Sequence, residues 1–242
     1  MEDNWFKDWF NTSYYHILYK DRDFDEAKNF INNLLNYLPT KKDSKFLDIA
    51  CGKGRHALQI NNSGFQTAAY DLSEESIKEA KKLEQKGLTF FVHDMRNLFR
   101  TNYFDFALNL FTSFGYFKTS RDEQNAILSA SKSLKVGGTF VIDFLNSEKV
   151  VQNIVPQELK TIEGINFNIQ KHIQDNRVHK KITFEVDGKP YSYTEKVKLL
   201  KLADFENYFN KAGLQITNVF GDYDLSNYNS NSNRLIIIAN KK

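Results

Sequence analysis

The chain has 242 residues, enough for one large domain with a small appended one. Its 41% hydrophobic and 26% charged residues are typical of a globular protein, and a net charge of only +3, with lysines spread along the chain, argues against a nucleic-acid-binding surface. The single cysteine excludes an internal disulfide, no apolar stretch is long enough to span a membrane, and the acidic N-terminus lacks the plan of a signal peptide, so we expect a cytoplasmic protein.

The N-terminal part of the sequence predicts helices. Apolar and aromatic residues recur at helical spacing over residues 4–38, and Pro39 ends the pattern. We expect most of these side chains to pack against a core, whereas the tyrosines and Arg22 carry polar ends that can face a ligand. Residues 1–40 are therefore expected to form a helical lid.

Strands and helices then alternate along the chain. The expected strands cover residues 45–50, 65–70, 88–92, 104–110 and 139–144, and the expected helices cover residues 54–62, 73–86 and 121–134. This alternation calls for a parallel sheet with helices on both faces. We predict an α/β fold with a doubly wound, Rossmann-like sheet of about seven strands.

The pattern changes at about residue 147. Residues 160–199 have extended character, and the pairs Asp175-Asn176 and Asp187-Gly188 punctuate them, which predicts two hairpins or a three-stranded meander. We place this segment in an inserted antiparallel β subdomain over residues 147–199. A helix and two strands close the chain at residues 202–212, 214–221 and 234–239, so the main domain comprises residues 1–146 and 200–242.

Residues 46–56, F-L-D-I-A-C-G-K-G-R-H, contain the motif around which we expect a site to form. An apolar run passes through a turn spaced by Gly52 and Gly54 and then opens a helix. Glycine lets the backbone approach a ligand closely, and the unpaired N–H groups at the start of the helix face the same space. This arrangement is typical of a nucleotide-like cofactor site at the carboxyl end of a parallel strand.

Polar side chains stand at the ends of four successive strands. They are Asp48, Asp71, Asp94 and Asn109. In a doubly wound sheet these positions line one crevice. Asp71 follows Gly52 by about twenty residues, the separation at which an acid binds the ribose hydroxyls of an adenosine.

Two cofactors fit this pattern. Residues 52–57, G-K-G-R-H-A, satisfy the G-x-G-x-x-A fingerprint of dinucleotide sites, which is a weak signal on its own. S-adenosylmethionine carries an ammonium that Asp48 can help to hold, whereas the same carboxylate would repel a pyrophosphate. Asp94 and Met95 suit adenine, because they offer a polar group for its amine and a thioether for its ring. The residues therefore favour S-adenosylmethionine, with S-adenosylhomocysteine as its product.

Several segments in succession resemble the motifs of the class I S-adenosylmethionine-dependent methyltransferases. They are L-D-I-A-C-G-K-G-R-H, A-Y-D-L-S, H-D-M-R, F-D-F-A-L-N-L-F-T-S-F-G-Y-F and L-K-V-G-G-T-F-V-I-D, and their order and spacing agree over about residues 40–146. The closing helix and strands are similar to the same fold, which implies that the last strand enters the sheet antiparallel. The N-terminal tyrosines and the inserted strands resemble its small-molecule branch. Ala50, where many members have a glycine, and Lys53 depart from the pattern.

The resemblance completes the set of expected cofactor-binding residues. This set comprises Tyr14, Tyr19, Arg22, Asp48, Ala50, Gly52, Gly54, Asp71, Leu72, Asp94, Met95, Asn109 and Leu110. Asp71 would bind the ribose, and Asp94 with Met95 would frame adenine. Arg22 would close over the carboxylate of the donor with Tyr14 or Tyr19, because a guanidinium binds a carboxylate through two parallel hydrogen bonds. An ion pair between Arg22 and its neighbouring aspartates fits the sequence equally well.

The acceptor side is defined by fewer residues. Those expected to wall it are Phe114, Tyr116, Phe117 and Asn146, under cover of the inserted strands. Positioning and desolvation can carry most of the rate, and Tyr15 and Tyr116 are the candidate general bases. The loop after the fourth strand lacks the Pro-Pro-aromatic sequence of nucleic-acid base methyltransferases, and no carboxylate cluster suggests a metal. We predict direct in-line methyl transfer to the nitrogen or oxygen of a small molecule, by a monomer or homodimer with no nucleic-acid or membrane partner.

Two other functions are compatible with the sequence. An NAD-dependent oxidoreductase would use the same glycine turn and the same ribose-binding acid. A non-catalytic S-adenosylmethionine-binding protein would keep the cofactor turn without the chemistry.

Overall fold

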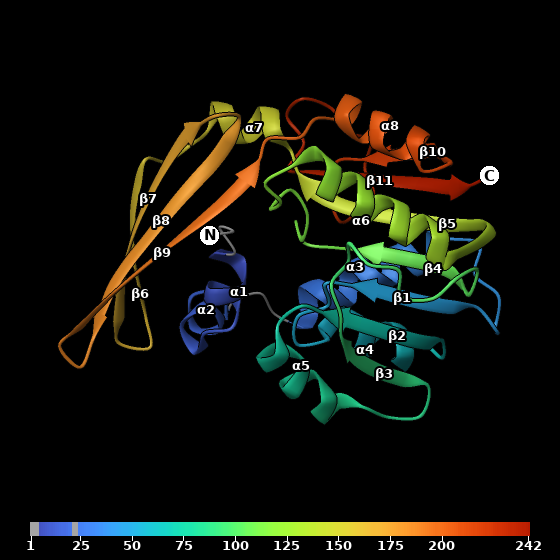
Figure 1. Cartoon of the computed structure of the whole chain (residues 1–242), viewed down its shortest axis with the longest axis horizontal. Helices are drawn as coiled ribbons and strands as arrows, with labels where there is room; N and C mark the ends of the chain where they lie inside the picture. Colours follow the sequence, from blue (N-terminus) through green and yellow to red (C-terminus); the bar gives the residue numbers. More distant parts are fainter. Residues whose placement is uncertain (1–4, 21–23) are drawn as a thin grey trace.

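A seven-stranded mixed sheet runs through the structure (Figure 1). The computed structural model describes residues 5–20 and 24–242. The strands of this sheet are β1 (Lys45–Ile49), β2 (Gln66–Asp71), β3 (Leu88–Val92), β4 (Phe104–Asn109), β5 (Leu134–Leu145), β10 (Leu214–Phe220) and β11 (Arg234–Lys241). Their order is β10-β11-β5-β4-β1-β2-β3, with β1 to β5 parallel and β11 antiparallel to both of its neighbours. The predicted doubly wound sheet with an antiparallel last strand is confirmed.

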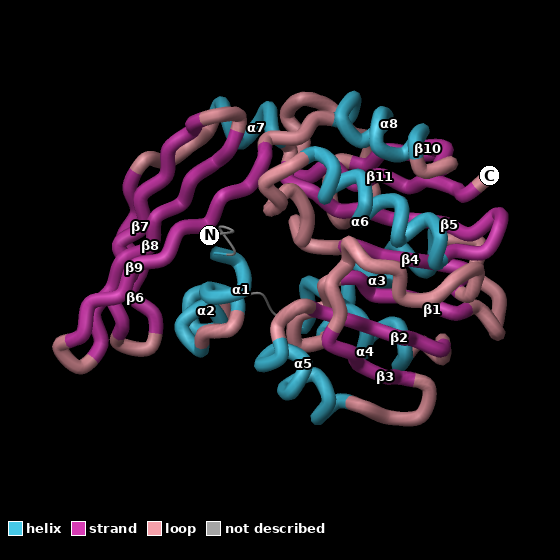
Figure 2. Tube along the Cα trace, viewed as in Figure 1, coloured by secondary structure: helices cyan, strands magenta, loops and turns pink. Residues whose placement is uncertain are grey.

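Helices cover both faces of this sheet (Figure 2). One face carries α3 (Phe24–Tyr37), α4 (Arg55–Asn62) and α5 (Glu74–Ala80), which is followed by the 3-10 turn η1 (Lys81–Leu83), and the other carries α6 (Ser120–Ser133) and α8 (Leu202–Lys211). Successive strand residues point to opposite faces, so Phe46 packs with α3 while Leu47 packs on the α6 and α8 side. Both faces of the parallel strands are therefore buried, which explains their near-continuous apolar sequences.

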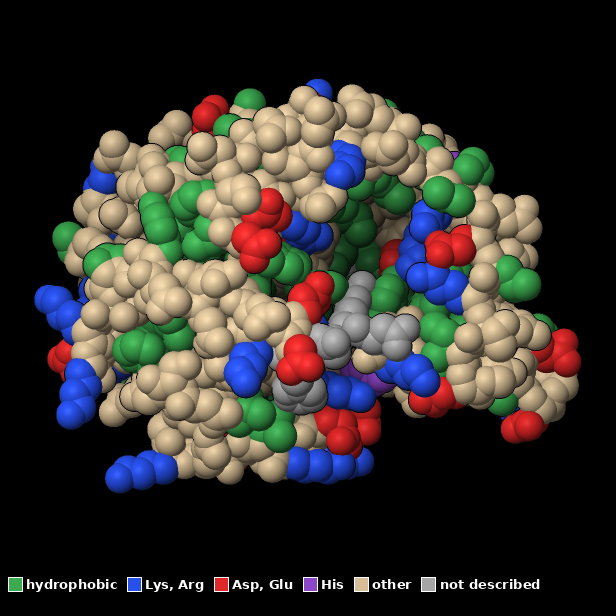
Figure 3. Space-filling view, turned by 180° about the vertical axis from the view of Figure 1, so that it is seen from behind, with side chains coloured by type: hydrophobic (Ala, Val, Ile, Leu, Met, Phe, Trp, Pro, Cys, Tyr) green, Lys and Arg blue, Asp and Glu red, His purple; other side chains and the backbone are tan. Residues whose placement is uncertain are grey.

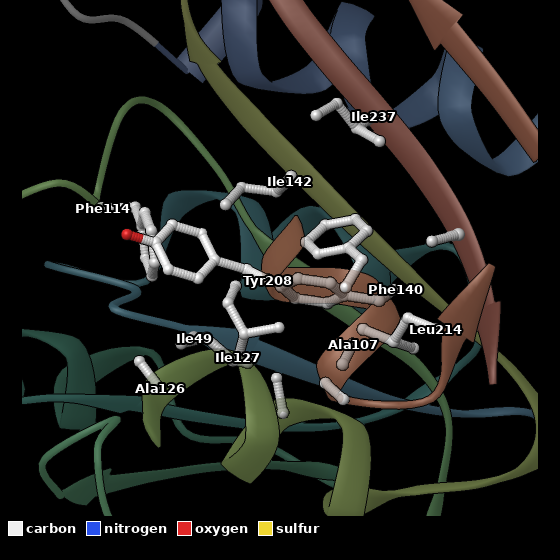
Figure 4. Packing of buried hydrophobic residues seen from close by; sticks show 14 of the residues in the cluster. Ile49, Ala107, Phe114, Ala126, Ile127, Phe140, Ile142, Tyr208, Leu214 and Ile237 are labelled. Carbon is white, nitrogen blue, oxygen red and sulfur yellow. The ribbon is translucent and has the colours of Figure 1, made fainter. Parts of the chain in front are cut away.

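The core on the α6 and α8 side contains several aromatic rings (Figure 4). Phe140 of β5 contacts Phe209 of α8 with ring centroids 5.6 Å apart, and Phe144 contacts Phe205 at 5.3 Å. Tyr208 lies beside Phe140 between the sheet and α6 in Figure 4. Such ring pairs add a specific geometry to the burial of apolar area, so they fix α8 against β5.

A second sheet is inserted after β5 and α7 (Ser147–Gln152). It has four antiparallel strands in chain order, β6 (Gln157–Ile162), β7 (Ile165–Gln174), β8 (Arg177–Val186) and β9 (Lys189–Lys198). The predicted turns at Asp175-Asn176 and Asp187-Gly188 have left-handed backbones at both positions, as two-residue hairpins require. A third such turn at Glu163-Gly164 adds β6, so the meander has one strand more than we predicted. The strand β6 has mostly polar and exposed residues, which hid it in the sequence.

The first two helices pack on this inserted sheet, whereas α3 packs on the main sheet. Helix α1 (Trp5–Phe10) and helix α2 (Ser13–Leu18) bury Trp9 and Leu18 against strands β7 and β8. The indole Nε1 of Trp9 donates a hydrogen bond to Glu195 of β9 at 2.7 Å, and the hydroxyl of Tyr19 donates to the same carboxylate at 2.7 Å. Figure 1 shows α1 and α2 between the inserted sheet and the main sheet. The segment expected to form a lid, residues 1–40, thus contains helices that pack on two different sheets. None of the described helices is long and apolar enough to cross a membrane.

Strand β5 allows a matched test of burial. Val141 is fully buried between the sheet and α3, whereas Val136 is 77% exposed at the start of the same strand. We expect Val141→Ala to lower the free energy of unfolding by about 2 kcal/mol, from the lost methyl groups and the residual cavity. Val136→Ala should change it by less than about 0.5 kcal/mol. Urea denaturation of both variants measures the difference, and equal effects would contradict this packing.

Candidate active site

A pocket of about 780 Å³ lies at the carboxyl ends of the parallel strands. Aromatic side chains of α1 and α2, together with Glu195 and Val197 of the inserted sheet, line its other side. Figure 3 shows the molecule hollowed between its two parts, with hydrophobic side chains inside the hollow and charged side chains at its rim. Eleven of the residues predicted for the site line this pocket. They are Tyr15, Tyr19, Ala50, Gly52, Asp71, Leu72, Asp94, Met95, Leu110, Tyr116 and Phe117.

The turn after β1 has a left-handed backbone at three alternate positions. The φ angles are 58° at Ala50, 55° at Gly52 and 84° at Gly54. A Cβ atom on Gly52 would meet nothing within 4 Å, so this glycine leaves open space beside the backbone at the pocket. A Cβ atom on Gly54 would come within 2.5 Å of the Phe90 ring, so this glycine is required by packing against β3 rather than by the pocket. Ala50 adopts the strained conformation without the freedom of a glycine.

Asp71 connects this turn to the next helix. Its two carboxylate oxygens accept hydrogen bonds from the backbone N–H of Gly52 at 2.8 Å and of Ser73 at 2.9 Å. Burial raises the pKa of Asp71, and these hydrogen bonds oppose the rise. Each oxygen keeps a second lone pair, so the carboxylate can bind a hydroxyl in the pocket without releasing the turn.

Two buried polar side chains lie beneath the same turn. Asp48 and Asn109 are 1% and 2% exposed, and among the described residues Oδ2 of Asp48 and Oδ1 of Asn109 have no hydrogen-bond partner. The amide of Asn109 donates to the carbonyl of Ile49 at 3.1 Å, which places its oxygen beside the end of β1. Burial and the neighbouring Asp71 raise the pKa of Asp48 to about 7. Neither side chain lines the pocket itself, so both act on it from behind the turn.

Asp94 and Met95 border the pocket after β3. The guanidinium of Arg96 donates hydrogen bonds to both carboxylate oxygens of Asp94, the shortest at 2.7 Å from Nη2. Burial alone would raise the pKa of Asp94, but the bonds from Arg96 outweigh it and lower the pKa. Asp94 is therefore ionised and fixed in position at neutral pH.

An aromatic wall faces these residues across the pocket. It consists of Trp5, Phe10, Tyr15 and Tyr116. Trp5 and Phe10 each contact Tyr116 edge to face with ring centroids 5.5 Å apart, and Phe10 contacts Tyr15 at 4.8 Å. The hydroxyl of Tyr116 donates a hydrogen bond to the carbonyl of Thr112. The wall joins α1 and α2 to the loop that follows β4.

Several predicted site residues lie outside the pocket. Phe114 is buried against Phe205 and packs in the core, and Asn146 is 1% exposed, caps α7 and holds the 229–232 loop. Tyr14 packs against Tyr191 of the inserted sheet. Arg22 lies outside the described residues.

Other pocket residues were not in the predicted set. Arg55 opens α4, and its guanidinium lies over the Phe111 ring at 4.5 Å. His16, Glu195 and Arg234 also line the pocket. Burial lowers the pKa of His16 to about 4, so this imidazole is neutral at pH 7. Arg55 directly follows the glycine turn and was detectable from that position, whereas Glu195 and Arg234 arrive from distant strands.

Comparisons with known proteins give one family. A family model described as "Methyltransferase domain" matches residues 40–206. The dTDP-3-amino-3,4,6-trideoxy-alpha-D-glucopyranose N,N-dimethyltransferase of Streptomyces venezuelae is 27% identical over 188 residues, which cover 73% of this chain and 78% of the relative.

Two solved structures share the fold. An S-adenosylmethionine-dependent methyltransferase from Clostridium acetobutylicum ATCC 824 is similar with a TM-score of 0.80 and 24% identity, covering 94% of this chain and 96% of its own. The sugar N-methyltransferase KedS8 from Streptoalloteichus sp ATCC 53650 has a TM-score of 0.71 and 19% identity, with 94% and 92% covered.

The buried carboxyl of Asp48 predicts a specific pH dependence. Its pKa is about 7 in the folded chain and near its ordinary value of 3.8 after unfolding, so the folded state binds the proton more tightly. The stabilisation by this group is therefore complete below about pH 4 and is lost as the pH rises towards 7. Asp48→Asn removes this titration, and we expect its free energy of unfolding, relative to the parent, to rise by about 2 kcal/mol between pH 5 and pH 7.

Urea denaturation at several pH values measures this difference. Asp43→Asn, at an exposed position before β1, is the matched control and should differ from the parent by the same amount at every pH. A pH-independent difference for Asp48→Asn would mean that this carboxyl titrates normally.

Proposed function

The chain belongs to the methyltransferase domain family, and we propose that it transfers a methyl group from S-adenosylmethionine to the nitrogen of a small amine. The observation that carries this proposal is the crevice at the ends of β1 to β4. There, a glycine turn, the fixed carboxylates of Asp71 and Asp94 and the aromatic wall surround one pocket.

The residues of the crevice fit S-adenosylmethionine. The remaining lone pairs of Asp71 suit the ribose hydroxyls, and Asp94 with Met95 suits adenine. Asp48 lies beneath the turn and does not line the pocket, so we assign it an electrostatic effect on the ammonium of the donor rather than a contact. Arg55 borders the same space from the start of α4, and its guanidinium is suited to the carboxylate of the donor. We therefore add Arg55 to the carboxylate-binding role first assigned to Arg22.

The chain mainly has to position the acceptor. S-adenosylmethionine supplies a methyl group that is already electrophilic, so alignment and exclusion of water provide most of the rate. Leu110 and Phe111 line the pocket where β4 ends, and the aromatic wall covers it from the other side. These apolar surfaces exclude water and leave an in-line approach as the direct route for a nucleophile.

Three titratable side chains at the pocket are poorly suited to act as a general base, which favours a nitrogen acceptor. A neutral amine attacks without prior deprotonation, whereas an alcohol needs a base. His16 is neutral but weakly basic, the hydroxyl of Tyr116 already donates to Thr112, and Glu195 already accepts from Trp9. The names of the N,N-dimethyltransferase and the sugar N-methyltransferase reported above support the same choice for this chain.

The ribose assignment predicts a binding defect. Asp71→Ala should reduce the affinity for S-adenosylhomocysteine at least 100-fold, and Asp71→Asn, which keeps one acceptor oxygen, should reduce it less. Calorimetric titration measures both. Asp105→Ala is the matched control, because Asp105 also accepts a backbone N–H, from Lys45 at 2.8 Å, at the opposite end of the strands. Unchanged affinity in Asp71→Ala, or tight binding of NAD in place of S-adenosylhomocysteine by the parent, would refute the assignment.

The positioning mechanism predicts small effects at the two candidate bases. We expect Tyr15→Phe and Tyr116→Phe to lower kcat less than about tenfold and to leave the pH profile of kcat/KM unchanged, because neither hydroxyl removes a proton. The assay is methyl transfer to a panel of primary amines at several pH values. A loss of more than about 100-fold together with a shifted pH profile would identify that tyrosine as a general base.

A further inference from the structure

Arg234 stands at the side of the pocket away from Asp71 and Asp94, and its guanidinium lies near the same Phe111 ring as that of Arg55. It begins β11 and pairs with Leu145 at the end of β5, so in the strand order it lies across β4 from Asp71 on β2 and from Asp94 after β3. A molecule that reaches from the cofactor side over the end of β4 therefore meets this guanidinium. This position belongs to the acceptor if the proposed function is correct.

The hydrogen bonds of Arg234 are incomplete. Its Nε donates to Oδ1 of Asp143 at 2.7 Å, and its Nη2 donates to the hydroxyl oxygen of Thr112 at 2.8 Å. A guanidinium has five N–H donors, and the others have no acceptor among the described residues. The side chain is 19% exposed and lines the pocket, so these donors are accessible to water or to a ligand. A ligand oxyanion that replaces this water would accept charge-assisted hydrogen bonds from the guanidinium.

Asp143 fixes the guanidinium in place. This carboxylate is fully buried and also accepts hydrogen bonds from the backbone N–H of Phe111 at 2.8 Å and from the hydroxyl of Tyr223 at 3.2 Å. Because these bonds anchor it from several directions, Asp143 cannot follow the arginine towards the pocket or serve there as a base. Arg234 is thus held by its Nε edge and one Nη2 hydrogen.

Thr112 adds a second donor at the same place. Its hydroxyl oxygen accepts from Arg234, and its own hydrogen has no acceptor among the described residues. Thr112 lines the pocket, as does Arg234. A ligand at this point therefore meets N–H and O–H donors together, and it meets no carboxylate that is not already paired.

We propose that the methyl acceptor is an amine that also carries an oxyanion, a carboxylate or a phosphate, and that Arg234 and Thr112 bind this oxyanion. A planar guanidinium binds either group through two parallel hydrogen bonds, which fix orientation as well as position. The oxyanion anchors the acceptor at β11, and its amine reaches over the end of β4 towards the methyl donor. The proposal rests on the proposed function and specifies which small amines the pocket selects.

The test titrates acetate, inorganic phosphate and pyrophosphate into the protein by calorimetry at low ionic strength, with and without saturating S-adenosylhomocysteine. We expect at least one of these anions to bind the parent, and the preferred anion distinguishes a carboxylate from a phosphate acceptor. Arg234→Lys keeps the charge beside Asp143 but loses the planar fork, so anion affinity should fall at least tenfold. Thr112→Val should lower it about threefold.

Arg100→Lys is the matched control. Arg100 packs over the rings of Tyr103 and Phe99 outside the pocket, and its replacement should leave anion affinity unchanged. Thermal unfolding checks that each variant is folded. If Arg234→Lys is unstable, Thr112→Val still tests the site, because it retains the Arg234–Asp143 ion pair. Equal anion affinity in the parent and both pocket variants, or no anion binding by the parent, would overturn the proposal. If the parent protein did not bind S-adenosylhomocysteine, the proposed function would be refuted instead. The anion titration without S-adenosylhomocysteine would still test the anion site.

Discussion

After β1 and after β4 the chain turns away from the sheet through residues with a left-handed backbone conformation. The shape of the pocket depends on these two turns. Gly52 after β1 and the consecutive residues Phe111 and Thr112 after β4 all have positive φ angles. Such conformations cost free energy for residues other than glycine, and the surrounding hydrogen bonds maintain them. Asp71 holds the first turn and Asp143 holds the second, each by accepting backbone N–H groups. The carboxylates of Asp71 and Asp143 thus shape both sides of the crevice before any ligand arrives.

The sequence predicted the architecture where the signals were local. The parallel sheet was predicted from the apolar runs of β1 to β5 and the glycines between them. Two of the three inserted hairpins were predicted from the pairs Asp175-Asn176 and Asp187-Gly188. Strand β6 was missed because its polar residues show no buried face. The sequence also could not predict that α1 and α2 pack on the inserted sheet while α3 packs on the main sheet. All three helices have apolar stripes, and only contacts with distant residues such as Ile182 decide which sheet each helix packs on.

The same distinction applies to the candidate site. Asp71, Asp94 and Met95 were found because strand ends converge on one edge of a parallel sheet. Arg234 was not, because its role arises from β11 returning beside β5, and no local motif marks it. Phe114 and Tyr116 lie two residues apart in one loop, yet the first turns into the core and the second into the pocket. The direction of a side chain in an irregular loop depends on contacts that a single sequence does not display.

The packing of α1 and α2 on the inserted sheet has a consequence for synthesis. Trp9 and its hydrogen-bond partner Glu195 are 186 residues apart in the chain. At 5–20 residues per second, the apolar faces of the first helices leave the ribosome roughly 10–40 seconds before β9 does. For most of that interval, until β7 and β8 emerge, Trp9 and Leu18 lack the surface that buries them in the native protein. The strand ends within residues 45–145 emerge during this time, whereas the packing of the aromatic wall needs the inserted sheet and Arg234 arrives only with β11, so the acceptor side of the pocket is the last to be completed.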